Sequence, residues 1–167
     1  QTTWLSDWSS DVCSSDLAFC FTKCTTQTGG YPTVSIDAAR AVPGAERSYD
    51  WKNKVIFQLT VGELPLVYGV FSGAFPELSL VGHGKANNKS LTIKDQEGKY
   101  FLSMQFGREP SIAIPATAKD TFRVMIMLLE QMKANAEGLD TRDVLHIAHR
   151  VCAKHVNPQR QQQPVAA

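Results

Sequence analysis

Between residues 77 and 115 the chain alternates apolar and polar side chains with a period of two. The alternation runs through ELSLVGHG (77–84), KSLTIKD (89–95), KYFLSMQF (99–106) and SIAIP (111–115). Successive side chains of a β-strand point to opposite faces, so this pattern predicts four half-buried strands. Their connections are short, and Gly98 suits a tight turn. The segment is therefore predicted to form a four-stranded antiparallel meander.

Helical spacing is predicted on both sides of the meander. KVIFQLTV (54–61) is strand-like and is a candidate for one extra N-terminal strand. The capping-box pattern at 60–63 then predicts a short helix over residues 61–72, for which a second strand is the alternative. After the meander, Thr117 is the expected N-cap of a helix that Gly138 ends. We expect one stripe of this helix to face the core or a dimer seam: Phe122, Met125, Ile126, Leu129 and Met132.

A last helix is expected from Asp140 or Thr141, with its apolar face turned inward (Val144, Leu145, Ala148, Val151 and Cys152). The fold class is therefore α+β, one antiparallel sheet with helices packed on one face, in a single domain over residues 50–156. Residues 18–49 show no sustained period and are expected to be irregular or disordered. The polar, proline-containing segment 157–167 is expected to be a disordered tail.

The stretch DWSSDVCSSDL (7–17) has no helical or strand period. Written in codons, it is similar to a common sequencing-library adapter. We therefore expect residues 1–17 to be an unstructured artefact and exclude them from fold reasoning; a natural serine- and aspartate-rich leader is the alternative. A secretory signal would need a basic and then an apolar region, and neither is present.

Net charge and the number of cysteines indicate which partners and which cellular compartment to expect. Excluding residues 1–17 removes three aspartates and no basic residue, so the formal charge of +1 becomes +1 + 3 = +4. This mild excess permits a polyanion partner. An odd number of remaining cysteines predicts a reducing, cytoplasmic compartment. No apolar run reaches the roughly 18 residues of a membrane helix, so no membrane partner is expected.

Catalytic motifs are not found. GHGK (82–85) lacks the spacing of a phosphate loop, and GVFSG (69–73) is not a nucleophile elbow. His146, His149 and His155 flank Cys152 on the last predicted helix, but this spacing cannot direct all four to one ion, and His83 is the single plain partner elsewhere. We predict a non-enzymatic protein without metal or cofactor.

The outer face of the predicted sheet indicates a binding function. Cations, hydrogen-bonding side chains and one aromatic ring gather there and in the flanking loops: Lys85, Lys89, Lys94, Lys99, Phe101, Ser103, Gln105 and Arg108. Lysines can follow the phosphates of a single strand while a ring stacks on an unpaired base. The alternative is that Phe101 packs under a helix or in a dimer seam and the lysines are solvated.

SLTIKDQEGKYFLSMQF and SIAIPATAKDTFRVMIMLLEQM resemble the single-stranded DNA-binding domain of the transcriptional positive cofactor four family and its bacterial relatives. The match rests on the turn Lys94-Asp-Gln-Glu-Gly-Lys99 and on Ser111-Ile-Ala-Ile114 before the helix. The chain departs from that family in its short 106–111 loop and in its additional elements. Whirly proteins are similar in sheet-plus-helix arrangement and have more elements.

The resemblance implies a homodimer formed through the helices, with Lys94, Lys99, Phe101 and Ser103 on the DNA-binding surface. We therefore predict sequence-tolerant binding of single-stranded DNA or RNA by the outer face of the sheet. A bacterial setting, in plasmid or integrating-element DNA processing, is our working hypothesis. The alternative function is a protein-interaction or assembly module that uses the same face.

Overall fold

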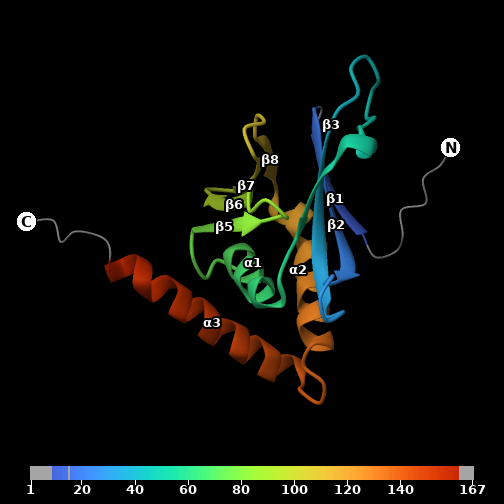
Figure 1. Cartoon of the computed structure of the whole chain (residues 1–167). Coiled ribbons are helices and arrows are strands. Elements are labelled where there is room, and N and C mark those ends of the chain that lie inside the picture. Colours follow the sequence, from blue (N-terminus) through green and yellow to red (C-terminus); the bar gives the residue numbers. More distant parts are fainter. Residues whose placement is uncertain (1–8, 15, 162–167) are drawn as a thin grey trace, which may run out of the picture.

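The computed structural model describes residues 9–14 and 16–161 and contains two four-stranded antiparallel sheets and three α-helices (Figure 1). The first sheet has the order β1 (Ser9–Cys13), β2 (Leu17–Thr25), β3 (Pro32–Arg40) and β4 (Val55–Gln58). The second has the order β5 (Glu77–His83), β6 (Lys89–Gln96), β7 (Lys99–Phe106) and β8 (Ile112–Ala116). The α+β class and the antiparallel meander are confirmed, the meander being the second sheet.

The expectation that residues 18–49 are irregular is wrong. β2 and β3 pair without interruption from Leu17↔Arg40 to Thr25↔Pro32, and Phe19 and Phe21 of β2 are fully buried. Phe19, Phe21, Val34 and Ile36 do alternate on the inner face, but small residues on the other face are buried as well (Ala18, Thr33 and Ala39), which obscures the period of two. The strand expected near residues 54–61 also belongs to this first sheet, because β4 pairs with β3.

The expectation that residues 1–17 are unstructured fails for 9–13 and for Leu17, the first residue of β2. β1 pairs with β2 over five positions, from Ser9↔Thr22 to Cys13↔Ala18, and Val12 is 2% exposed. Alternation places Val12 opposite Phe19 on the inner face, where burial of its side chain favours the strand. Residues 1–8 and 15 lie outside the described residues. The similarity of the codons to a sequencing adapter is an inference about the coding DNA, which the structure of the protein does not test, so it stays a prediction.

Helix α1 (Leu64–Phe71) follows a 3-10 turn over Val61–Glu63 and packs on β5 and β6. Its predicted capping box is present, because Glu63 Oε2 accepts from the Thr60 backbone N–H at 2.7 Å. Helix α2 (Ala118–Ala134) packs on β3 and on α1, so it joins the two sheets. The two inner sheet faces and the three helices share one hydrophobic core.

Thr117 is the N-cap of α2, as predicted, but the stripe expected to face the core is rotated. Phe122 and Ile126 are exposed, and Met125 and Leu129 are half-buried. The buried face consists of Thr121, Val124, Met127, Leu128, Gln131 and Met132. Polar Gln131 is buried because its side chain donates to the Thr33 carbonyl oxygen at 2.5 Å and to that of Cys24 at 3.2 Å. The core half of the expectation is therefore wrong for Phe122 and Ile126, and their place in a dimer seam stays a prediction.

Helix α3 (Thr141–Gln161) begins where the sequence predicts and packs on α1 and α2 through Val144, Ala148 and Cys152. Figure 1 shows it extending from the loop after α2 along the side of α1 that faces away from the second sheet. It continues to Gln161, four residues past 157, the predicted start of a disordered tail. Residues 162–167 lie outside the described range. Neither α3 nor any other described helix has the length and apolar character needed to cross a bilayer.

Candidate nucleic-acid interface

The outer face of the second sheet has the side-chain order that the sequence predicts. Lys94 lies opposite Phe101, Thr92 opposite Ser103, and Ser90 opposite Gln105 across the β6–β7 ladder. Phe101 is half-buried rather than fully exposed, with Lys94 on one side and Pro115 of β8 on the other. The ammonium of Lys94 pairs with Glu77 at 3.3 Å, which offsets part of its charge.

The eight predicted site residues do not form one cluster. Lys99 begins β7 and Phe106 ends it, so the two ends of the ladder lie about 24 Å apart. Lys94, Lys99 and Phe101 lie toward one end. The other end has Lys89 at the start of β6, with Lys85 and Arg108 exposed in the adjoining loops.

Gln105 has a structural role that the sequence did not indicate. Its side-chain amide donates to the carbonyl oxygens of Gly107 at 3.1 Å and Glu109 at 2.5 Å, which fixes the short β7–β8 loop. Arg40 of the first sheet donates through Nη2 to the Pro110 carbonyl oxygen in the same loop at 2.7 Å. The loop is therefore held to both sheets.

The two sheets enclose a cleft beside this loop. We name it the inter-sheet cleft; it has a volume of about 430 Å³ and is lined by Arg40, Asp50, Asn53, Lys54, Val55, Ile56, Lys89, Met104, Phe106, Glu109, Pro110 and Ile112. Lys89 crosses it, because Nζ donates to the Ile56 carbonyl oxygen of β4 at 2.8 Å. The same ammonium lies 5.4 Å from the centroid of the Phe106 ring, within the range of a cation–π contact.

Phe106 is a second aromatic residue of β7, which the sequence pattern does not indicate as a binding residue. Alternation assigned it to the core side with Leu102 and Met104, and it does share their face. It lies at the last position of β7, where that face opens into the inter-sheet cleft, so its side chain remains 39% exposed. Ile56 of the opposite sheet is 45% exposed in the same cleft. Apolar surface is thus accessible from both sides.

The residues that line the cleft have a formal charge of +1. Arg40, Lys54 and Lys89 supply three cations against the carboxylates of Asp50 and Glu109. Lys54 is paired with Asp37 at 2.6 Å. In the described part of the chain, Lys89 forms no ion pair, so its charge is directed to the Ile56 carbonyl and the Phe106 ring.

His83 is used in packing beside the cleft. Its Nε2 lies 2.7 Å from Glu63 Oε1, and its ring stacks on Phe57 with centroids 4.0 Å apart. These contacts join β5 to β4 and to the start of α1. Over residues 9–14 and 16–161 no group of three or more histidine, cysteine or acidic side chains is arranged to hold a metal ion.

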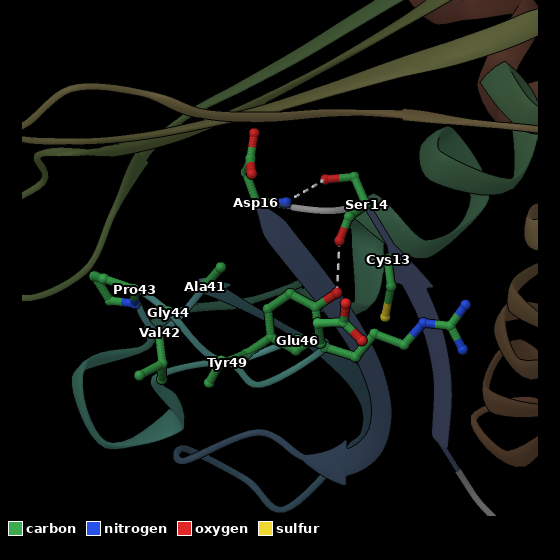
Figure 2. Close-up of a pocket in the computed structure, with 11 residues that line it drawn as sticks. Cys13, Ser14, Asp16, Ala41, Val42, Pro43, Gly44, Glu46 and Tyr49 are labelled. Carbon is green, nitrogen blue, oxygen red and sulfur yellow. Dashed lines mark hydrogen bonds between the residues drawn. The ribbon is translucent and has the colours of Figure 1, made fainter.

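A larger, more open hollow of about 1280 Å³ lies under the β3–β4 loop. Figure 2 shows Tyr49 at its centre, with the hydroxyl donating to the Ser14 carbonyl oxygen at 2.6 Å. Asp16, Glu46 and Arg47 are its charged lining residues, so carboxylates outnumber cations. The formal charge of this lining is −1, whereas that of the inter-sheet cleft is +1, so the cleft is the more favourable of the two for a polyanion.

The thiols are poorly suited to nucleophilic chemistry. Burial raises the pKa of Cys20 to about 12, and it also raises the pKa values of Cys13, Cys24 and Cys152. A thiol attacks as its thiolate, and a raised pKa keeps these groups protonated at neutral pH.

Comparison with known proteins finds no matching family model and no matching curated protein. Solved structures do match. WHY1 from Arabidopsis thaliana gives a TM-score of 0.54 at 19% identity, covering 72% of this chain and 85% of that one. WHY3 from the same plant gives 0.52 at 16% identity, over 77% and 86%. The plant transcriptional regulator PBF-2 gives 0.53 at 19% identity, over 83% and 99%. The chain therefore has a Whirly-like fold, and its resemblance to the positive cofactor four domain stays a prediction.

Proposed function

We propose that this chain binds single-stranded nucleic acid, without catalysis, in the inter-sheet cleft. The observation that carries the proposal is the position of Lys89 beside the partly exposed Phe106 ring at the edge of a 430 Å³ cavity. A ring accepts any base by stacking, and an adjacent ammonium meets the phosphate next to it. The volume lies within the roughly 300–1,000 Å³ that small organic ligands occupy in proteins.

The surroundings of the cleft support a passing strand. Lys85 and Arg108 are exposed at the same end of the second sheet, and Arg40 enters from the first. These cations can neutralise successive phosphates without reading sequence. The fold is shared with a plant transcriptional regulator, which also favours nucleic acid over a protein partner.

The outer-face site predicted from Lys94, Lys99, Phe101 and Ser103 is the alternative location. It lies on the opposite face of β7 from Phe106, so a bound base cannot stack on both rings at once. The two phenylalanines thus form a matched pair: each is in β7, each is partly exposed, and each would lose only its ring on substitution by alanine.

The test is fluorescence anisotropy with labelled oligo-dT and a duplex of equal length. Phe106→Ala should weaken oligo-dT binding by roughly 1–3 kcal/mol, with little change in the salt dependence, because stacking is lost and no phosphate contact is. Lys89→Met should reduce the slope of log affinity against log salt by about 0.7, the value for one phosphate on a single strand. Circular dichroism would verify that both variants remain folded.

Phe101→Ala is the control and should leave affinity unchanged. Loss of binding on Phe101→Ala, with Phe106→Ala normal, would move the site to the outer face. No binding by the parent chain at low salt would remove the nucleic-acid function and favour the interaction module. The homodimer and the plasmid or integrating-element setting stay predictions that this assay does not address.

A further inference from the structure

Helix α3 carries cations that the proposed cleft does not use. Between residues 144 and 156 the sequence contains Arg150, Lys154 and three histidines but no aspartate or glutamate. Arg142 lies two residues before this stretch and has a side chain 88% exposed. The whole chain has a formal charge of only +1, so this helix is locally far more basic than the protein.

The two arginines, the lysine and two of the histidines lie on one face of the helix. At 3.6 residues per turn, the α3 basic face, defined as Arg142, His146, His149, Arg150 and Lys154, is centred roughly 160° from the buried residues Val144, Ala148 and Cys152. All five residues of the face are exposed. Its length from Arg142 to Lys154 is about 18 Å, with steps of four residues that advance about 6 Å each.

Two carboxylates lie near this face. Asp140 precedes the helix, and Asp143 of the first turn points in nearly the same direction as Arg150 and Lys154 but lies about 10 Å from Arg150 along the axis. Arg142 lies 3.7 Å from Asp140, and both side chains are largely exposed, so water screens the pair. Among the described residues, Arg150 and Lys154 have no ion pair. Arg150 and Lys154, about 6 Å apart along the helix axis, are therefore the uncompensated cations of this face, and they attract a polyanion such as duplex DNA, which presents one charge per about 1.7 Å of its axis.

The apolar surface of α3 argues against a lipid partner. An interfacial helix needs a broad apolar face to insert among acyl chains. Here that face is already packed on α1 and α2, which leaves Ile147 and Val151 as the exposed large apolar residues of the described part of the helix. Electrostatic contact with phosphates requires no apolar face.

We propose that the α3 basic face is a second nucleic-acid surface, which binds the phosphate backbone of duplex DNA independently of sequence. It is built on α3, whereas the inter-sheet cleft is built from β4, β6, β7 and the adjoining loops. The protein would thus hold an unpaired strand in the cleft and a duplex on the helix. Either surface can be removed without touching the other.

The experiment compares two triple variants that each change the formal charge from +1 to −2. The first carries Arg142→Gln, Arg150→Gln and Lys154→Gln. The control carries Lys119→Gln, Arg123→Gln and Lys133→Gln, which are exposed on α2. Affinity for a 20-base-pair duplex is measured from 50 to 300 mM salt, and thermal melting verifies folding.

The α3 variant should lose about eightfold in duplex affinity at 0.1 M salt for each phosphate contact removed, with a slope lower by about 0.9 per contact. The control should stay near the parent, and Phe106→Ala should bind duplex normally even where it loses oligo-dT. Equal losses in both triple variants, or none in the α3 variant, would overturn the proposal. So would α3-dependent binding to phosphatidylserine vesicles with duplex binding unchanged.

Discussion

Deleting residues 1–14 tests whether β1 stabilises the protein. The deletion removes Val12, which is 2% exposed, and the acceptor of the 2.6 Å bond from the Tyr49 hydroxyl. Burial of a valine side chain contributes roughly 1.5–3 kcal/mol, and the hydrogen bond roughly 0.5–1.5 kcal/mol. The free energy of unfolding should therefore fall by about 2–4.5 kcal/mol, before any gain from leaving the strand unordered.

For a chain of this size each kcal/mol shifts the melting temperature by about 2–4 °C, so a fall of roughly 4–18 °C is expected. Differential scanning calorimetry of the parent and the deletion measures it. Val12→Ala and Asp11→Ala form a matched pair in β1, because the first side chain is buried and the second exposed. Val12→Ala should cost about 1.6 kcal/mol for two methyl groups, and Asp11→Ala close to nothing.

An unchanged melting temperature would refute this reasoning. It would mean that β1 adds nothing to the core, as expected of a segment whose codons come from a sequencing adapter. The experiment therefore decides between a strand with a stabilising role and one whose pairing has no energetic weight.

Three further predictions concern α2 and the first sheet. Leu128→Ala should lower the free energy of unfolding, measured by denaturant titration, by roughly 2–5 kcal/mol, because Leu128 is fully buried. Leu129→Ala should lower it clearly less, because Leu129 is half-buried, and the reverse order would mean that α2 is rotated. Phe122 is 63% and Ile126 42% exposed, so if they form a homodimer seam Phe122→Asp should yield a monomer in analytical ultracentrifugation, whereas a monomeric parent would contradict the seam. The pKa of Cys20 is about 12 in the folded protein and 9.0 in the unfolded chain, so the free energy of unfolding should fall as the pH rises above 9. Cys20→Ala should reduce this alkaline loss in urea titrations.

The second sheet was predictable because the ends of its strands can be recognised in the sequence itself. Leu91 and Ile93 alternate with polar residues, Gly98 takes a positive φ of 81° in the turn, and the strands pair with their neighbours in sequence. The first sheet lacked such local information. Ala38 and Ala39 are consecutive residues of β3 and are both buried, so the burial pattern does not alternate there, and α2, which packs on β3, begins about eighty residues later in the chain.

The candidate site was partly predictable for the same reason. Lys89 was identified as a cation near the sheet, but its contact with Ile56 depends on a β4 that belongs to another sheet. Alternation placed Phe106 on the core side, because it shows which face of a strand a residue occupies. It does not show where the elements that cover this face end. A cleft between two sheets is a property of their packing, and no single strand encodes it.

The two cations that join the sheets across the cleft also connect the affinity for a ligand with the separation of the sheets. Lys89 is bonded to the Ile56 carbonyl and Arg40 to that of Pro110, so a phosphate that takes either cation must compete with a bond that closes the gap. Occupancy and separation of the sheets are then linked, and the linkage is reciprocal. A covalent cross-link that holds the sheets at their present spacing would lower the affinity for any ligand that needs those cations, while a substitution that loosens the gap would reduce the free energy spent in opening it.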